Sequence, residues 1–314
     1  MKLLADGAFH SGTAIGSKLG VTRAAVCKTV QALSAAGLEI ESVSGRGYRM
    51  AIAAHPLERR TILKALVGVG ISDLDVEILE EIDSTSRYLM QNKKTAPRVC
   101  LAEAQPQGRG RRGRAWITTP YHNLMLSMSW QFAAGPAAAA GLSLAAGVAL
   151  ARALETYGVR SLGLKWPNDI LVDGRKLGGV LVDLQGEANG PTRVVVGIGV
   201  NGYLGARAAA RIDQPWIDLY RIMNSAVDRN RLAALVVAEL YRMFEDFSAR
   251  GLAPFRRDWE RRHLYQEQRV RLDTGETSVV GTAIGVDELG ALVLRTAQGQ
   301  RETFHAGEIS LRPA

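Results

Sequence analysis

The dipeptide Asp173-Gly174 is the feature that most restricts the fold of this chain. It separates two strand-like runs, Ile170 to Val172 and Lys176 to Asp183. An Asp-Gly pair between such runs is a strong short-range signal for a β-hairpin, because both turn residues take positive φ angles at low cost. The segment therefore predicts antiparallel strands, and with them an antiparallel or mixed sheet.

The segments around this hairpin predict the rest of an α+β unit. Residues 193–200 are a continuous Val-rich run, which predicts a strand buried on both faces, and residues 232–251 fit a long amphipathic helix ended by Gly251. Residues 123–131 alternate and predict a half-buried strand, with one apolar face formed by Leu124, Leu126, Met128 and Trp130. Hairpins mixed with helices favour a sheet that carries its helices on one side.

One stretch requires a comparison with membrane spans. Phe132 to Ala151 carries no charged residue, but it is mostly Ala and Gly and contains Pro136 and Ser143. A spanning helix is richer in Leu and Ile, so the stretch predicts a buried helix of a soluble protein that begins near Pro136. Two cysteines exclude a disulfide framework, and no signal core precedes Asp6. We therefore expect a cytoplasmic protein without membrane contact.

The charge of the chain is uneven. Lys and Arg number 39 against 31 Asp and Glu, a net charge of +8, which favours polyanionic partners such as nucleotides or nucleic acid. The excess lies in residues 1–55 and in a loop at 109–114, which holds four arginines and no acid. We expect the polyanion contacts in these two places.

The first 55 residues predict a winged helix-turn-helix. Ser11 can cap a helix that ends at Gly20, and Thr22 can cap a second helix that Gly37 closes. Two short strands then flank a basic tip at 44–47, the wing. The residues predicted to contact DNA are Thr22, Arg23, Lys28, Gln31 and Arg46. The alternative is a small helical subdomain that only packs on the rest of the chain.

The loop from Gly108 to Arg114 matches the pattern G-x-G-x-x-G. A dinucleotide-binding motif would open a helix and be followed by an acid about 20 residues later. Here residues 115–120 look extended, and no acid occurs between Gly113 and Glu155. A protein kinase is also excluded, because the chain has no His-Arg-Asp or Asp-Phe-Gly triplet. What remains is an anion-binding loop, or a solvated charge run or RNA-binding arm.

Four more polar segments accompany this loop along the chain. They are Glu81 to Ser86, where hydroxyls follow a strand, the turn Lys165 to Asp169, the strand start Arg175 to Gly179, and Gly197 to Asn201, where a buried strand ends in a polar residue. Singly, the first could be an ordinary helix cap and the second only a turn. Together and in this order they indicate a binding site.

This ordered set resembles the bifunctional biotin–protein ligases that also repress biotin synthesis, over essentially the whole chain. The resemblance rests on Asp83 to Ser86, Gln105 to Trp116, Lys165 to Asp169, Arg175 to Gly179 and Gly197 to Asn201. It implies three domains: the winged helix at 1–55, a catalytic domain related to class II synthetases at 56–267, and an SH3-like β-barrel at 268–314.

The resemblance also implies a set of site residues, with Lys176 and Arg111 as the catalytic pair. The biotin site would comprise Ser84, Thr85, Ser86, Gln105, Gly108, Arg109, Gly110, Arg111, Lys176, Gly178 and Gly179. The nucleotide site would comprise Arg111, Arg112, Trp116, Asn168, Lys176, Asn201 and Trp216. Three places depart from the family pattern: Ser86 replaces a usual Asn, Pro106-Gln107 replaces Gln-Ala, and Gly178 replaces Ala.

The implied reaction uses ATP with Mg²⁺ to convert biotin into biotinyl-5′-AMP, and then transfers biotin to a lysine of a biotin carboxyl carrier protein of acetyl-CoA carboxylase. No resident metal site is expected. The implied regulation is by biotinyl-5′-AMP as corepressor, which promotes a homodimer that binds operator DNA. The alternatives are a ligase with a vestigial winged helix, a lipoate-type ligase, which the tandem arginines disfavour, and a DNA-binding regulator without catalysis.

Overall fold

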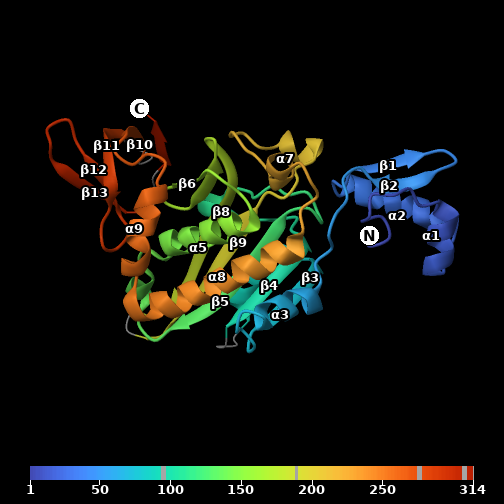
Figure 1. Ribbon diagram of the computed structural model, residues 1–314, viewed down its shortest axis with the longest axis horizontal. Helices are drawn as coiled ribbons and strands as arrows, with labels where there is room; N and C mark the ends of the chain where they lie inside the picture. The colour runs from blue at the N-terminus through green and yellow to red at the C-terminus, as the bar shows by residue number, and fades with distance from the viewer. Residues whose placement is uncertain (93–96, 188–189, 274–277, 306–309, 314) are drawn as a thin grey trace.

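The computed structural model describes residues 1–92, 97–187, 190–273, 278–305 and 310–313, and these form three separate sheets (Figure 1). A two-stranded sheet lies near the N-terminus, a seven-stranded sheet in the centre and a five-stranded sheet near the C-terminus. The central sheet carries the largest hydrophobic core. The predicted α+β class is therefore confirmed.

The N-terminal part is the predicted winged helix-turn-helix. Its elements are α1 (Gly12–Leu19), α2 (Arg23–Ala35), β1 (Ile40–Val43) and β2 (Gly47–Met50). Ser11 Oγ accepts a hydrogen bond from Ala14 N, and Thr22 Oγ1 accepts one from Ala25 N, so both predicted helix caps are present. The ring of Phe9, which precedes α1, lies 4.1 Å from the Arg46 guanidinium at the wing and 4.7 Å from that of Arg49 in β2.

The central sheet has the strand order β3-β4-β5-β9-β8-β7-β6. The strands are β3 (Asp75–Glu81), β4 (Arg98–Ala104), β5 (Leu124–Phe132), β6 (Leu162–Lys165), β7 (Asp169–Val172), β8 (Arg175–Gly186) and β9 (Thr192–Val200). Only β3 and β4 pair in parallel among these neighbours. Asp173 and Gly174 have φ angles of 49° and 71°, so the predicted β7–β8 hairpin is confirmed.

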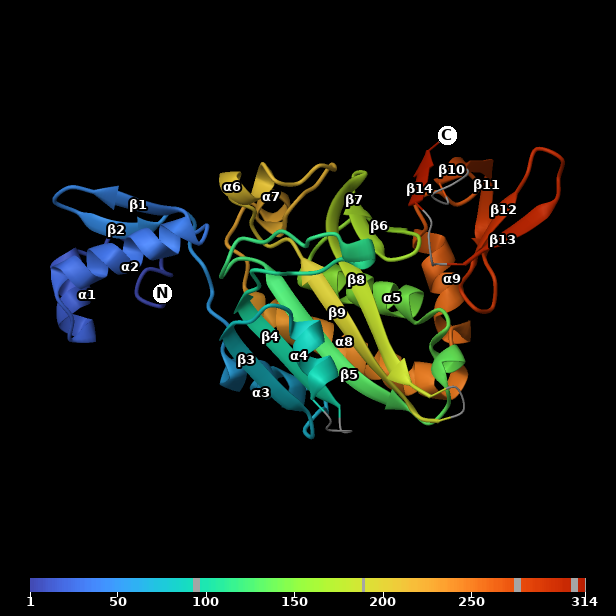
Figure 2. The same cartoon turned by 180° about the vertical axis from the view of Figure 1, so that it is seen from behind.

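Helices cover both faces of this sheet, which corrects the expectation of one covered face. The long helices α5 (Leu142–Tyr157) and α8 (Arg229–Arg250) lie on the face seen in Figure 1, whereas α4 (Thr85–Gln91) lies on the face seen in Figure 2. Because α4 packs on β5, Met125 and Ser127 are buried as fully as Leu124. The prediction that β5 is half-buried is therefore wrong.

The uncharged stretch forms the core helix of the central part. A 3-10 turn, η2 (Pro136–Ala139), precedes α5, so regular helix begins later than predicted. Residues 136–157 are the one candidate among the described residues that is long and apolar enough to cross a membrane, and 67% of its most apolar window is buried inside the fold. Its side chains pack against α8 and the sheet, as expected for a buried helix.

The C-terminal part is a five-stranded antiparallel sheet of order β13-β12-β11-β10-β14. Its strands are β10 (Arg269–Asp273), β11 (Ser278–Val286), β12 (Leu292–Arg295), β13 (Arg301–Phe304) and β14 (Ser310–Pro313). The β11–β12 connection reaches the central part, where Trp166 Nε1 donates to Gly290 O at 3.1 Å. This bond ties the C-terminal sheet to the turn between β6 and β7.

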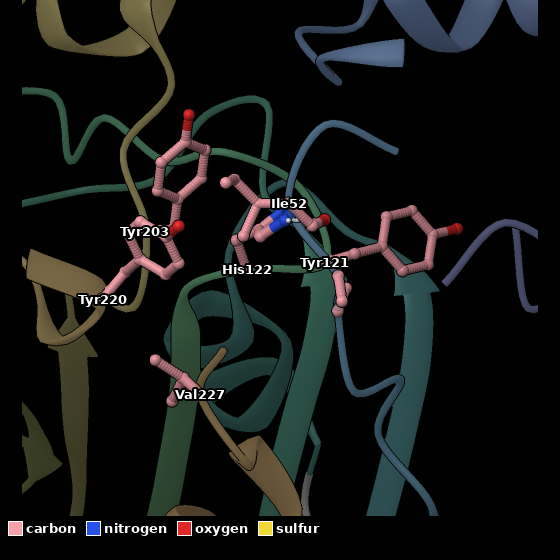
Figure 3. A pocket seen from close by; sticks show the side chains of 8 residues that line it. Ile52, Tyr121, His122, Tyr203, Tyr220 and Val227 are labelled. Carbon is pink, nitrogen blue, oxygen red and sulfur yellow. Dashed lines mark hydrogen bonds between the residues drawn. The ribbon is translucent and has the colours of Figure 1, made fainter. Parts of the chain in front are cut away.

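The winged helix contacts the central part through a small junction (Figure 3). A cavity of about 10 Å³ lies there, close to the minimum for one water molecule. His122 lies between Tyr203 on one side and Tyr121 on the other, and its Nε2 lies 3.3 Å from Ile52 O. Burial lowers the pKa of His122, while the contacts with the Ile52 and Pro120 carbonyls oppose this shift. Tyr121 packs into the core of the winged helix.

A second set of contacts joins the end of α2 to the segment after β9. Glu39 Oε1 accepts a hydrogen bond from Ala206 N at 2.8 Å, and the Tyr203 hydroxyl donates to Glu39 Oε2 at 2.5 Å. Arg207 donates to the carbonyls of Ser34 and Ala35 near the C-terminal end of α2. A cation there stabilises the helix, because terminal carbonyl groups carry partial negative charge.

A buried ion pair fixes the segment between the winged helix and the central part. Arg229, at the start of α8, lies 2.6 Å from Glu103 Oε2 of β4, and both side chains are under 5% exposed. Arg229 also donates to His55 O at 2.9 Å, and Glu103 Oε1 accepts from Leu57 N at 2.6 Å. The segment from His55 to Leu57 is therefore held by charged groups at both of its ends.

We expect Arg229→Met to lower the free energy of unfolding by about 3–5 kcal/mol, because it leaves the Glu103 carboxylate buried without its cation. Arg242→Met is the matched control: Arg242 pairs with Glu239 on the exposed side of the same helix. This control should change stability by less than about 1 kcal/mol. Urea unfolding measures the free energy of unfolding of both variants. Equal losses of stability would contradict the stabilising role of the Arg229–Glu103 pair.

A second stability prediction concerns His263, which follows α9 (Ala253–Arg262) and stacks on Trp259 at 4.5 Å. Burial lowers its pKa from 6.5 to about 4. Since the folded state disfavours the protonated ring, stability is unaffected above about pH 6.5 and falls as the pH drops toward 4. His263→Phe should remove a loss of roughly 3 kcal/mol over this window. The free energy of unfolding of both proteins is measured from pH 7 to 4.5. The same dependence on pH in the wild type and the variant would refute this prediction.

Candidate active site

The face of the central sheet under α4 carries a row of glycines. Gly179 of β8 pairs with Gly199 of β9, which pairs with Met125 of β5, and two residues along the same face Gly197 pairs with Ser127. These three glycines leave the backbone of β8 and β9 uncovered by side chains of their own. A flat group, from a ligand or from the protein itself, can therefore approach the strands closely at this point.

Polar residues stand at both ends of this glycine row. Asp169 pairs with Gly179 at one end, and Asp183 lies four residues farther along β8 on the same face. At a rise of about 3.3 Å per residue, the two ends are about 13 Å apart. This separation suits a small elongated molecule with different groups at its two ends.

The first end is built around Lys176. Its Nζ lies 2.8 Å from Asp169 Oδ1, with both side chains 18% exposed, and 5.4 Å from the centre of the Trp116 ring. The backbone is braced on both sides: Lys176 N donates to Pro215 O, and Lys176 O accepts from Ile217 N. A cation held this firmly beside bare backbone can bind a carboxylate or phosphate oxygen.

Asn201 supports the same end from behind. Its Nδ2 donates to Lys176 O at 3.2 Å and to Ile217 O at 3.0 Å, and the side chain is buried. Asn201 therefore fixes the segment that carries Trp216 beside the strand that carries Lys176. The Arg221 guanidinium lies 4.6 Å from the Trp216 ring centre.

The second end is built from hydroxyl and amide groups. Ser84 Oγ caps α4, as the helix-cap alternative expected, yet Thr85 and Ser86 face the sheet. Thr85 N donates to Gln105 Oε1 at 2.7 Å, and Thr85 Oγ1 lies 2.8 Å from Ser127 Oγ. Ser86 Oγ donates to Asp183 Oδ2. This end offers hydrogen-bonding groups to a neutral polar ring.

The arginine loop closes over the row and is not the start of a helix, which agrees with the rejection of a dinucleotide motif. Gly110 N donates to Arg114 O and Trp116 N to Gly108 O, and only a short 3-10 turn, η1 (Arg111–Gly113), lies between them. A Cβ on Gly199 would lie 2.5 Å from the Trp116 ring, so only glycine permits this contact. Trp116 thus covers one end of the row.

Two loop arginines reach fixed partners. Arg109 lies 3.2 Å from Asp183, and Arg111 donates to Asn168 Oδ1 at 3.4 Å, while Asn168 Nδ2 holds Val180 O at 2.8 Å. Burial lowers the pKa of Arg111, as does the neighbouring charge of Arg112, whereas Asp169 opposes the shift. An arginine nevertheless stays charged at neutral pH, so the loop presents a cation near Lys176.

The structure gathers most of the predicted site residues around the row. Gly178 is an exception, because it points to the opposite face, where a Cβ would lie 2.8 Å from Gly199 O. Arg112 is exposed, with a φ angle of 57°. The sequence motifs do not predict roles for Asp183 and Ser127 or the ion pair of Asp169. The sequence signal that could have found them is their position on the same strand face as the glycines. Among the described residues, no group of three or more His, Cys, Asp or Glu could hold a metal ion.

Comparison with known proteins gives a match for each of the three parts of the chain. Residues 78–201 match the biotin/lipoate A/B protein ligase family, residues 267–312 the biotin protein ligase C-terminal domain, and residues 1–49 an HTH domain. The Escherichia coli (strain K12) bifunctional ligase/repressor BirA is 38% identical over 314 residues, which cover 99% of this chain and 96% of that protein. The chain belongs to the bifunctional biotin ligase/repressor family.

Two further relatives place the ligase part within this family. A Paracoccus denitrificans biotin–[acetyl-CoA-carboxylase] ligase is 34% identical and covers 74% of this chain and 98% of its own length. The solved structure of an Aquifex aeolicus biotin protein ligase in complex with biotin and ATP has a TM-score of 0.66 at 27% identity, and covers 76% of this chain and 99% of that one. These relatives are ligases, which argues against the alternative of a DNA-binding regulator without catalysis.

Proposed function

We propose that this chain is an ATP-dependent biotin–protein ligase that makes biotinyl-5′-AMP and transfers biotin to a lysine of a biotin carboxyl carrier protein of acetyl-CoA carboxylase. The observation that carries the proposal is the glycine row with the Lys176–Asp169 pair at one end and hydroxyl groups at the other. Biotin has a matching shape, with a carboxylate at one end and a neutral ring at the other. Family membership supports the same assignment.

The first step activates the biotin carboxylate, which is otherwise a poor electrophile. A carboxylate oxygen attacks the α-phosphorus of ATP, the bond to the bridging oxygen breaks, and pyrophosphate leaves. Lys176 lies where it can bind both the carboxylate and an α-phosphate oxygen as negative charge builds, with Arg111 assisting from the loop.

The second step transfers the biotinyl group. The deprotonated amine of the carrier lysine attacks the acyl carbon of the mixed anhydride, the C–O bond breaks, and AMP leaves. The intermediate must be shielded from water until then, and the loop with Trp116 lies over the glycine row in a position to do so.

The nucleotide is assigned to the surroundings of Lys176. Trp216 offers an aromatic face for adenine, Arg221 lies over that ring, and Arg112 and Asn168 extend from the loop and the β6–β7 turn. Mg²⁺ bound to ATP would neutralise negative charge on the pyrophosphate.

We assign operator binding to the winged helix, with the unit boundaries at 1–55, 56–267 and 268–314. Arg23 and Lys28 are exposed on α2, and Arg46 is exposed on the wing. One such domain offers few phosphate contacts, so tight binding needs two protomers on a two-fold site. Biotinyl-5′-AMP acts as corepressor by binding the dimer better than the monomer. A cytoplasmic protein fits these partners.

Lys176→Ala should reduce biotinyl-5′-AMP formation about 100-fold or more, as expected when one transition-state donor is lost. Arg175→Ala is the matched control, because Arg175 is exposed on the same strand and pairs only loosely with Asp173 at 3.7 Å. Each variant is incubated with labelled biotin, ATP and a biotin carboxyl carrier domain. Pyrophosphate release measures the first step, and transfer of the label to the carrier domain measures the second. Normal rates in the lysine variant would remove Lys176 from the mechanism.

Operator binding tests the regulatory half. Biotin with ATP should raise operator affinity in gel shifts, and Arg23→Ala or Arg46→Ala should weaken binding and reduce its salt dependence, by a slope of about 1 for each lost phosphate contact. Arg160→Ala, an exposed change in the central part, should have no effect. If no sequence-specific complex forms with both ligands present, the protein is a ligase with a vestigial winged helix.

A further inference from the structure

Asp183 occupies the end of the glycine row that lies farthest from Lys176. It pairs with Val195 on the face under α4, and its side chain is 25% exposed. It accepts hydrogen bonds from two residues assigned to the biotin site: the hydroxyl of Ser86 and the guanidinium of Arg109. Asp183 therefore joins α4, the arginine loop and β8 at a single carboxylate.

The bond from Ser86 fixes what that hydroxyl can offer a ligand. A serine hydroxyl has one hydrogen and two lone pairs, and an ionised carboxylate can only accept. Because the hydrogen of Ser86 is directed at Asp183, its oxygen presents only lone pairs to any other group. Ser86 is 3% exposed and sits at the start of α4. It is a buried hydrogen-bond acceptor of defined direction.

The neighbouring Gln105 has the opposite character. Its Oε1 accepts from Thr85 N at 2.7 Å, so its Nε2 group is the part that remains to donate. Biotin's cyclic urea has one carbonyl acceptor and two N–H donors. An acceptor at Ser86 and a donor at Gln105 are complementary to that group.

The second bond neutralises charge. Arg109 would otherwise place a full positive charge at this end, as Lys176 does at the other. Pairing with Asp183 leaves the ring end neutral, so the carboxylate of the ligand is attracted to the Lys176 end alone. The pair thus sets which way a molecule with one anionic end lies along the row.

From these contacts we propose that Asp183 is a specificity-determining positioning residue for biotin: it fixes Ser86 as the acceptor for a urea N–H and neutralises Arg109. The inference rests on the proposed ligase function. It also gives a physical role to Ser86, because the carboxylate of Asp183 fixes the direction of its hydroxyl group.

Asp183→Asn tests this, because the amide has nearly the same shape but can donate to Ser86 and cannot neutralise Arg109. We expect the KM for biotin to rise about 10-fold or more, with kcat at saturating biotin and the KM for ATP within about 3-fold of the wild type. Asp183→Glu, which keeps the carboxylate, should lie closer to the wild type. The control is Asp173→Asn, which removes the same charge from the exposed β7–β8 turn and should leave all three constants unchanged.

A double-mutant cycle separates positioning from a general structural role. If Asp183 acts through Ser86, the two changes are not independent. The fold increase in the KM for biotin of the double variant Asp183→Asn, Ser86→Ala over the wild type should then be smaller than the product of the two single-variant increases. An unchanged KM for biotin in Asp183→Asn, or equal increases in the KM values for biotin and ATP, would overturn the proposal. A wild-type protein that fails to activate biotin would instead refute the ligase function itself.

Discussion

The pairing register of β9 between β5 and β8 is the constraint on which the site depends. It places Gly179, Gly197 and Gly199 on the face under α4, and it brings Asp169 and Asp183 onto that same face. A slip by one residue would turn all of these groups toward α5 and α8. The Val-rich positions that alternate with the glycines prevent this, because they are buried in the main core on the other face. The apolar core and the polar site are therefore specified by the same strands.

The ligase site and the DNA-binding part share one segment of chain. Asn201 holds the carbonyl of Lys176, Tyr203 and Ala206 hold Glu39, and Arg207 binds the carbonyls near the end of α2. Asn201 and Arg207 are only six positions apart, so one short segment contacts both Lys176 and the end of α2. Since the buried Arg229–Glu103 pair also holds the connecting segment, the winged helix is fixed to the central part at several points. In the proposed function, biotinyl-5′-AMP bound near Lys176 would therefore lie one short segment of chain away from α2.

The sequence predicts the elements of this protein better than their surroundings. The helix caps at Ser11 and Thr22, the Asp173-Gly174 hairpin and the helix ended by Gly251 follow from local rules, and all are present. The burial of β5 on both faces depends on α4, which packs there through tertiary contacts that no local pattern encodes. For the same reason, the motifs indicate Lys176 and the arginine loop but give no role to Asp183, whose partners lie 97 and 74 residues away along the chain.

In the proposed binding mode, a ligand lies along the glycine row in one direction, with its carboxylate at Lys176 and its ring beside Ser86. A crystal structure of the protein with biotin tests this most directly. We expect a carboxylate oxygen within about 3 Å of Lys176 Nζ, a hydrogen-bond distance, and a urea nitrogen within a similar distance of Ser86 Oγ. Biotin bound in the reverse direction, or bound away from Gly179 and Gly199, would contradict the account.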